Sequence, residues 1–529
     1  MVRARSRTVL FFCPPQHCPI SRPAGPRAAP SDPHASHAAQ RATALVAESE
    51  SASPPSVGGE CALGTDVLED RQEDFECLAT AVPRFASMLL ASEGDPDAPD
   101  IPTPRSYAEV ITSPYSQWQA AMDAEMTSWK STGTYVDAAP PSRANIVDGM
   151  WIFRVKRPPD SPPTFKARYV ARGFSQRQGV DYFQTFSPTP KMTTLRVLLH
   201  VAAQHDYELH SLDFSTIFLQ GSPHEEIWLR RPPGFTGSFL AGTQWRLRRR
   251  VYGLRQAPRE WHDTLRTTLA ALGFTPATSD PSLFLRTDTS LPPFYVLVRD
   301  TPALTWVFQR FGFQFSSPQP TPLSTDHSLS APPSDESVEQ SGPYPEIVGC
   351  LMYLMTCTRP DHAYPLSVLA RYVAPGRPRK VDDSATQRSS QGYTFSLGSG
   401  SVSWRSSRSS SVLSSNYEAE IYAGAMAAQE LCWLTYLQTD LGEQPRSPPF
   451  LCVDNKAMIA LCQEHRTKHI ALRYFLAREL QQRGQLRLAY VATRANTTDI
   501  FTKALPPGDH QRFSTILGLV LTLPHLLTA

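Results

Sequence analysis

The chain has 529 residues, enough for two to four domains with sizeable hydrophobic cores. It carries 51 Lys and Arg against 49 Asp and Glu, so its formal net charge of +2 favours no particular class of partner. Nine Cys residues without a CxxC spacing or a Cys/His cluster argue against a disulfide framework or a zinc module, and we expect a reducing intracellular compartment, the cytoplasm or the nucleus.

The N-terminal region is rich in Ala, Pro and Ser and shows little hydrophobic periodicity, which predicts disorder over residues 1–105. Residues 1–31 contain five Arg and no acid, as organelle transit peptides do, but their prolines would break the amphipathic helix of such a peptide. No apolar run reaches the ~18 residues that span a bilayer, so we expect no membrane partner.

Regular structure is predicted from about Ser106, beginning with a helix whose apolar residues recur on one face. The segments Trp151–Lys156 and Phe165–Gly173 then alternate apolar and basic residues around a Pro-rich turn, which predicts a β-hairpin. Its cations can clamp a triphosphate or simply protect an edge strand, and these residues alone favour the second reading. The helix face consists of Trp118, Met122, Met126 and Trp129, and the hairpin cations are Lys166 and Arg168.

Two stretches of the chain are locally basic. Residues 151–177 contain seven Lys and Arg and one acid, and residues 229–259 contain eight Arg and no acid. Such stretches suit the binding of a polyanion, although a solvated surface can also produce them.

A helix is predicted over Lys191–His205, with Leu195, Leu198, Leu199 and Ala202 facing the core. The strand after it, from Glu208, ends on a single carboxylate, Asp213, with the aromatic Phe218 five positions later. A further helix opens in Val251–Trp261, where Pro258 sits near the first turn.

Several long motifs occur here in order: Phe165–Phe174, Gly179–Tyr182, Thr185–Pro188, the Asp213 strand and Tyr252–Arg259. Together they resemble the reverse transcriptase of copia-type LTR retrotransposon polyproteins, a likeness that extends from about Ser106 to the C-terminus. The resemblance implies a right-hand polymerase that uses RNA templates and deoxynucleoside triphosphates. It assigns Asp213 to Mg²⁺ and catalysis, and Lys166, Arg168 and Phe218 to the incoming nucleotide. It also assigns Gln256 to the incoming nucleotide or the template, and Arg255 and Arg259 to nucleic acid.

The chain departs from this family at the second metal-binding motif. The family carries an aromatic-x-Asp-Asp box on a hairpin after the Gln256 helix, and the two carboxylates complete a two-metal site with the strand Asp. Here the strand Phe294–Val298 continues into Arg299, Asp300 and Pro302, so the Asp pair is missing and a cation replaces an acid. The sequence therefore predicts an inactive polymerase with a truncated palm.

The second half of the chain resembles a ribonuclease H domain in its order of strands and helices. Strands are predicted at Gly392–Leu397, Ser401–Trp404, Phe450–Asp454 and Leu486–Val491, and long helices at Glu418–Leu437 and Thr467–Gln482. The resemblance assigns Glu420, Asp454 and Asp499 as catalytic Mg²⁺ ligands for cleavage of a DNA/RNA hybrid. Lys468 and His469 either contact the backbone of the hybrid or belong to a solvated helix surface.

This domain is also incomplete, because the family's first Asp lies on a central strand that has no room before Arg388. Only Asp382 and Asp383 precede it. Loss of a central strand exposes sheet edges and removes core, so the sequence predicts reduced stability as well as absent activity.

The predicted fold class is thus α+β, a truncated fingers and palm followed by an incomplete α/β ribonuclease H-like domain with a mixed sheet. Two other hypotheses stay open: a nucleic-acid-binding remnant without catalysis, and the product of a decayed or wrongly assembled gene with no stable fold. The predicted regions are a disordered segment at 1–105, fingers and palm at 106–310, a linker and connection at 311–380, the ribonuclease H-like domain at 381–510, and a tail at 511–529.

Overall fold

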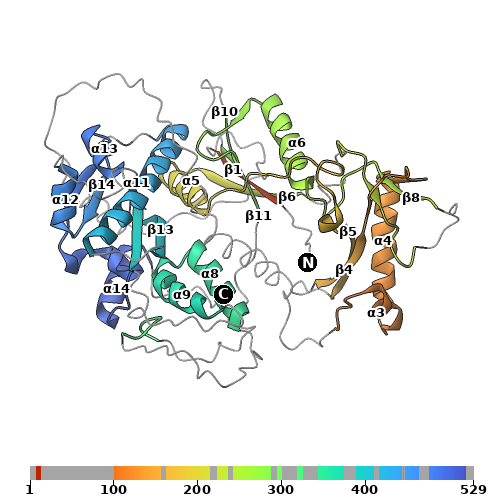
Figure 1. The fold of residues 1–529 in the computed structure, drawn as a ribbon, viewed down its shortest axis with the longest axis horizontal. Coiled ribbons are helices and arrows are strands. Elements are labelled where there is room, and N and C mark those ends of the chain that lie inside the picture. The colour runs from red at the N-terminus through yellow and green to blue at the C-terminus, as the bar shows by residue number, and fades with distance from the viewer. Residues whose placement is uncertain are drawn as a thin grey trace, which may run out of the picture. The chain divides into compact units, whose positions relative to one another are not determined.

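A computed structural model gives the fold of the chain (Figure 1). The chain divides into two units, Met1–Pro15 with Ala81–Ala529, and Gln16–Thr80; every described residue belongs to the first. Among the described helices, none is long and apolar enough to cross a membrane. The structure describes residues 7–13, 101–156, 162–214, 223–235, 242–286, 295–300, 319–325, 344–373, 389–398, 400–409, 416–443, 445, 447–463 and 476–519.

The predicted helix and hairpin near residue 110–170 are confirmed as α4 (Gln117–Ser131) and the antiparallel pair β4 (Gly149–Lys156) and β5 (Thr164–Ala171). All four residues of the predicted helix face are buried, and the Trp118 ring packs edge-on against Phe153 and Phe165. The helix therefore covers the apolar face of the hairpin. Around it lie α3 (Tyr107–Thr112) and a four-stranded sheet of β2 (Tyr135–Ala138), β8 (Gln244–Leu247), β7 (Trp228–Leu229) and β3 (Ile146–Val147).

The central feature is a five-stranded sheet, here called the palm sheet, with the strand order β6-β1-β11-β10-β9 (Figure 1). Its strands are β6 (Glu208–Phe214), β1 (Arg7–Cys13), β11 (Tyr295–Asp300), β10 (Leu283–Arg286) and β9 (Phe274–Pro276). The prediction of disorder over residues 1–105 is therefore wrong for residues 7–13. The Thr-Val-Leu-Phe-Phe run within β1 has high strand propensity and pairs with strands far away in the sequence.

Two helices accompany the palm sheet, α5 (Met192–Gln204) and α6 (Ala257–Ala271), the latter with Pro258 in its first turn as predicted. On α5 the predicted core positions Leu195, Leu198 and Ala202 are buried, but Leu199 is 40% exposed. Val197 and Val201 are buried instead, because the buried stripe of α5 is rotated from the predicted one.

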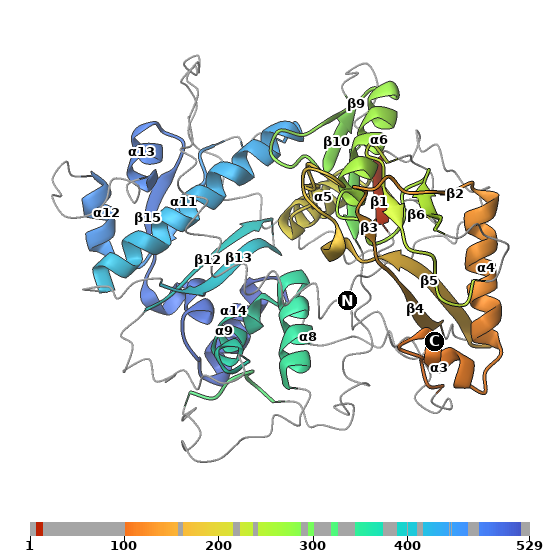
Figure 2. The same ribbon diagram turned by 45° about the vertical axis from the view of Figure 1, so that its right-hand side comes forward.

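The C-terminal half contains helices α8 (Tyr344–Cys357), α9 (Ala363–Leu369), α11 (Asn416–Asp440), α12 (Lys456–Gln463), α13 (Leu476–Gln482) and α14 (Pro507–Ile516). Its described strands form two separate pairs (Figure 2). One is the antiparallel hairpin of β12 (Ser390–Leu397) and β13 (Gly400–Arg408), and the other is the parallel pair of β14 (Phe450–Val453) and β15 (Arg487–Tyr490). Among the described strands, none joins the two pairs.

A shared core joins the palm sheet to this C-terminal half. Buried residues of α5, β10 and β11 pack in one cluster with Val402 of β13 and with Leu434, Leu437 and Leu441 at the end of α11. Arg196 of α5 lies 3.6 Å from the Trp404 ring centroid and donates a hydrogen bond to the Val402 carbonyl. The two halves are thus held by apolar packing and by hydrogen bonds.

Candidate nucleic-acid interface and carboxylate sites

The predicted polymerase carboxylate Asp213 lies on β6, one residue before the strand ends. Its partner in the sheet register is Thr8 of β1, and Thr8 pairs on its other side with Arg299 of β11. The same row of the sheet therefore carries an acid, a threonine and a cation. A second acid, Asp300, follows Arg299 in β11 and is in register with Arg7. Phe218, which the resemblance assigns to the incoming nucleotide, lies outside the described residues.

The β4–β5 hairpin presents cations on the face opposite α4. Arg154 and Lys166 are cross-strand partners, and Arg168 lies two residues further along β5. Since alternate residues of a strand share a face, these three side chains lie on one side, here called the fingers face. Lys166 is exposed, and the Arg168 guanidinium lies 4.7 Å from the Tyr252 ring centroid.

Gln256 is 1% exposed and lies inside the protein rather than at its surface. Its amide nitrogen donates to the Asp181 carbonyl at 2.9 Å and to a Glu225 carboxylate oxygen at 3.3 Å. Its amide oxygen accepts a hydrogen bond from Gln176 at 3.1 Å. Gln256 thus connects two loops through its hydrogen bonds. Its contact with a nucleotide stays a prediction.

The loop after β5 packs against the loop of Tyr252–Arg259 and exposes a group of aromatic rings. Arg255 donates from Nε to the Gly173 carbonyl at 2.7 Å and from Nη1 to the Tyr182 hydroxyl at 3.2 Å. Arg259 pairs with Asp263 one helical turn later at 3.7 Å. The exposed rings belong to Phe174, Phe183 and Phe186, which are 62–74% exposed and are here called the aromatic loop. Sequence reasoning missed this loop, although its three Phe residues stand among several Arg residues.

The second basic stretch, residues 229–259, is largely neutralised by the fold. Five of its eight arginines form ion pairs with carboxylates that come from outside the stretch. The buried pair of Arg250 and Glu260 shows how far this goes, since the side chains are only 7% and 4% exposed. These five arginines are therefore less available to a polyanion than the sequence suggests. The five pairs are Arg230–Asp148, Arg231–Asp137, Arg246–Glu226, Arg250–Glu260 and Arg259–Asp263.

The three predicted ribonuclease H carboxylates come from three separate elements. Glu420 is on α11, Asp454 directly follows β14, and Asp499 is in the short 3-10 helix Thr497–Phe501. Burial raises the pKa of Glu420, and the neighbouring charges of Asp454 and Asp499 raise it further, so the fold brings the three acids into one electrostatic neighbourhood.

Oxygen ligands of this kind suit Mg²⁺, but the arrangement is not that of a formed metal site. Within the described part of the chain, no three His, Cys, Asp or Glu side chains are grouped so as to hold an ion. Asp499 instead forms an ion pair with Lys503 at 2.8 Å. Lys468 and His469 lie outside the described residues, as do Asp382 and Asp383.

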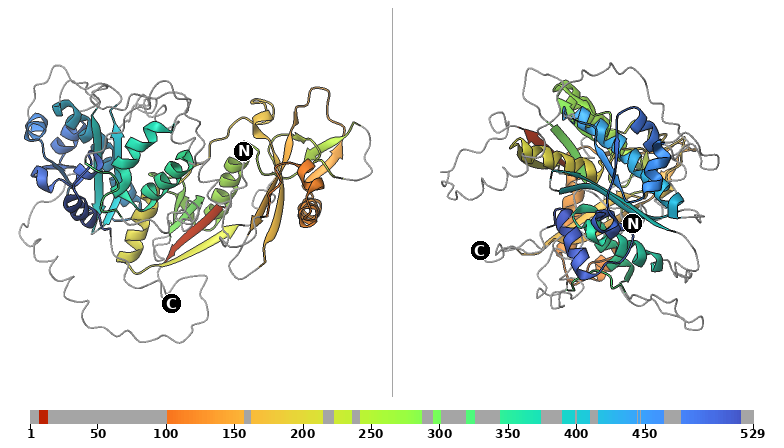
Figure 3. Two further views of the ribbon diagram at one scale, coloured as in Figure 1. Left: turned by 90° about the horizontal axis from the view of Figure 1, so that it is seen from below. Right: turned by 90° about the vertical axis from the view of Figure 1, so that its left-hand side faces the viewer.

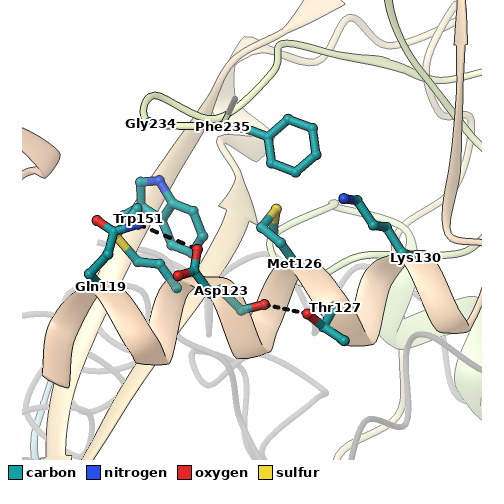
Figure 4. A pocket seen from close by; sticks show the side chains of 9 residues that line it. Gln119, Asp123, Met126, Thr127, Lys130, Trp151, Gly234 and Phe235 are labelled. Carbon is teal, nitrogen blue, oxygen red and sulfur yellow. Dashed lines mark hydrogen bonds between the residues drawn. The ribbon is translucent and has the colours of Figure 1, made fainter. Parts of the chain in front are cut away.

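A small cavity of about 180 Å³ lies beside α4, away from the predicted site residues (Figure 4). It is closed on one side by Trp151 and Phe235, and the Lys130 ammonium lies 5.1 Å from the Phe235 ring centroid. Within its wall Thr127 donates to the Asp123 carbonyl at 2.8 Å. None of the residues that line it belongs to the predicted polymerase or ribonuclease H sites.

Comparison with known proteins gives a consistent result. Residues 132–297 match the reverse transcriptase (RNA-dependent DNA polymerase) family. The chain is 28% identical to the retrovirus-related Pol polyprotein from transposon TNT 1-94 of Nicotiana tabacum, over 79% of this chain and 39% of the relative. It is 30% identical to the corresponding polyproteins from transposons RE2 and RE1 of Arabidopsis thaliana, over 77% of this chain and 34% of each relative. The chain therefore spans little more than a third of the length of these relatives.

The alignment lengths also indicate that this chain lacks internal segments that its relatives have. The match to the Nicotiana polyprotein extends over 516 residues, yet it covers only 79% of a 529-residue chain, which is far fewer than 516. The alignment therefore opens gaps in this chain, as expected when it lacks internal segments that its relatives carry. The reverse transcriptase match itself stops at Leu297, directly before Val298 and Arg299.

Proposed function

We propose, from the premise that this chain is a relative of copia-like retrotransposon Pol polyproteins and carries a reverse transcriptase segment, that it binds RNA and DNA/RNA hybrids without extending primers. The ancestral activity is RNA-directed DNA synthesis coupled to ribonuclease H cleavage. The present chain keeps the fingers that hold nucleic acid and deoxynucleoside triphosphates but lacks the acids that complete catalysis.

The observation that carries this proposal is the end of β11. Two Mg²⁺ ions would activate the primer 3′-hydroxyl and stabilise the leaving pyrophosphate, and a pair of ions needs more than one carboxylate. Asp213 of β6 lies in the register row of Arg299, and the chain has no pair of adjacent Asp residues at this end of β11. The family match ends at Leu297, just short of this arginine.

Binding is supported by the fingers face and the aromatic loop. Lys166 is exposed, and its ammonium group can reach phosphate oxygens from solvent. The exposed rings of Phe174, Phe183 and Phe186 provide surfaces on which unpaired bases can stack. Cations that track a backbone next to aromatic platforms are the usual elements of single-stranded nucleic-acid binding.

The ribonuclease H-like region is incomplete for the same physical reason. Glu420, Asp454 and Asp499 supply oxygen ligands of the right type, but the family's first Asp has no counterpart and Lys503 already pairs with Asp499. We infer that hybrid cleavage is absent along with polymerisation.

Primer extension tests the catalytic half of the proposal. The purified 529-residue chain is incubated with a poly(rA)/oligo(dT) primer-template, dTTP and Mg²⁺, and we expect no extension above a no-protein control. Extension that disappears in Asp213→Asn would overturn the proposal, because a working site would then depend on the strand carboxylate.

Fluorescence anisotropy with a labelled primer-template tests the binding half. We expect micromolar or tighter binding at low salt that weakens steeply with added KCl, because bound phosphates release counterions. Absence of salt-dependent binding by a chain that resists limited proteolysis would refute it. A chain with no protease-resistant core would instead support the hypothesis of a decayed gene product.

A further inference from the structure

β1 is paired along both of its edges in the palm sheet. Its seven residues pair antiparallel with Glu208–Phe214 on one side, and six of them pair antiparallel with Tyr295–Asp300 on the other (Figure 3). β1 is therefore an inner strand of the sheet. Residues close to the start of the chain join strands some 200 and 290 positions later in the sequence.

Without β1 the palm sheet would divide. β6 would lose its strand partner, because the described order of the sheet gives it no neighbour other than β1. β11 would keep only β10 and would expose one row of backbone N–H and C=O groups. Unpaired strand edges are costly when buried and promote aggregation when exposed.

The orientation of β1 matches that of a missing strand. A hairpin that continued beyond β11 would turn back and place its second strand antiparallel to β11, between β11 and β6. In the described residues no strand that comes after β11 in the sequence pairs with it. β1 lies in that position, with the same antiparallel direction.

The sequence of β1 suits an inner strand. Thr8 to Phe12 is a continuous run of β-branched, aliphatic and aromatic residues, the pattern of strands that are covered on both faces. α5 contacts it on one side. Pro14 and Pro15 come directly after it, and proline cannot donate to a sheet ladder, so the strand ends where its pairing ends.

We propose that residues 7–13 are an in-chain donor strand that replaces the second strand of the palm hairpin and restores a continuous sheet. The donor strand stabilises the palm and at the same time fills the place through which a hairpin carrying an Asp pair would return. This inference concerns how the sheet is completed, and it holds whether or not the chain binds nucleic acid.

Engineered disulfides test the register in the full-length chain. Thr8 and Arg299 are register partners, and partner Cα atoms in antiparallel strands are about 4.5–5.5 Å apart, within reach of a disulfide. The Thr8→Cys/Arg299→Cys variant should form an intramolecular cross-link on mild oxidation. The control Thr8→Cys/Val298→Cys, displaced by one residue, should cross-link at least fivefold less, because adjacent residues lie on opposite faces. Peptide mass spectrometry separates the new bond from the nine native cysteines.

Equal cross-linking in the two variants, or none in either, would overturn the proposal. Cross-links found only between two molecules would replace it with strand exchange between copies.

Hydrogen–deuterium exchange decides the question without the cysteine variants. In the unaltered chain we expect amides of residues 8–13 to be protected together with those of β11. Leu10→Pro should remove protection from both, because it deletes a ladder donor, whereas Leu10→Thr should retain it. If the unaltered residues 8–13 exchange within seconds while β11 stays protected, the donor strand does not exist. This measurement holds even if Leu10→Pro does not fold.

Discussion

The strands of the palm sheet and those of the ribonuclease H-like region are arranged differently. The palm sheet is continuous, because β1 pairs on both of its edges with strands from elsewhere in the chain. The described strands of the ribonuclease H-like region, predicted at residues 381–510, form two separate pairs. The first set of strands thus forms one continuous sheet, and the described strands of the second set do not.

The ribonuclease H-like region packs around its helices and against the palm sheet. α11 packs against the β12–β13 hairpin through Ile421, Ala428 and Leu431, with β14 residues in the same cluster (Figure 2). The C-terminal end of α11 packs in the same hydrophobic core as the palm sheet. α11 therefore connects the two strand pairs of the ribonuclease H-like region to the core of the palm sheet. Four changes would break or sharpen this comparison.

The largest effect is expected at the anchor of α11. Leu437 is fully buried in the cluster that contains Leu198, Tyr295 and Leu297 of the palm side. Leu437→Ala leaves a cavity and should lower the free energy of unfolding by about 4 kcal/mol, measured by urea denaturation. We expect the two regions to lose hydrogen-exchange protection together.

Leu199→Ala is the matched control, since Leu199 is 40% exposed on α5, and it should cost no more than about 0.5 kcal/mol. If Leu437→Ala unfolds only the ribonuclease H-like region and leaves the palm sheet protected, the anchor is not shared.

An acid-sensitive contact is expected where α14 meets the segment before α9. Asp361 is buried, accepts hydrogen bonds from Arg359 at 2.9 and 2.8 Å, and lies 3.6 Å from His362. Burial lowers the pKa of His362 to about 4, and burial also lowers the pKa of His510 on α14. A histidine with a lowered folded-state pKa stabilises the fold above its unfolded pKa of ~6.5, and this contribution is lost as the pH falls toward 4.

We therefore expect the free energy of unfolding to fall by up to about 3 kcal/mol between pH 7 and pH 4 through His362. Thermal unfolding at several pH values measures this, and His362→Gln should flatten the profile over that window. A variant whose pH profile is the same as that of the unaltered chain would contradict the assignment.

Two glycines compare the regions at single positions. Gly253, in the loop of Tyr252–Arg259, has φ +92°, and a Cβ there would collide with the Ala171 carbonyl. Gly442, two residues after the end of α11, has φ +76° but open space around it. Both alanine variants suffer the left-handed backbone, at about 1 kcal/mol, and Gly253→Ala adds the collision, so it should be the worse by about 2 kcal/mol. Equal melting temperatures would show that the two loops relax equally.

Sequence reasoning succeeded where a pattern is local. The β4–β5 hairpin, α4, α11 and the four strands of the C-terminal half follow from periodicities of two and 3.6 residues, but the helix α12 was not predicted. It failed for β1, because a seven-residue apolar run in a Pro-rich region carries no information about partners that lie some 200 residues away. The role of Gln256 was equally hidden, since a glutamine that ties two loops together looks the same in sequence as one that contacts a ligand.

The arginines of residues 229–259 show that the pairing of charges is equally hidden in the sequence. As a sequence they form an acid-free basic run, but the fold brings acids to them from as far away as Asp137. An ion pair with a distant residue leaves no mark on the local pattern. Their value for binding a polyanion could be judged only from the fold.

The smallest effect is expected at the fingers face, where a single charge is removed from the surface. Lys166→Ala should weaken binding of a labelled primer-template by a few fold at moderate salt and reduce the slope of log K against log [KCl] by about 0.9, the value for one phosphate contact on a duplex. Arg266→Ala on α6, an exposed cation away from the fingers face, is the control and should leave the slope unchanged. Equal slopes for all three chains would mean that the hairpin cations protect a strand edge, as the residues alone suggested. A reduced slope for Lys166→Ala alone would place the nucleic acid on the β4–β5 hairpin, which is separate from the palm sheet.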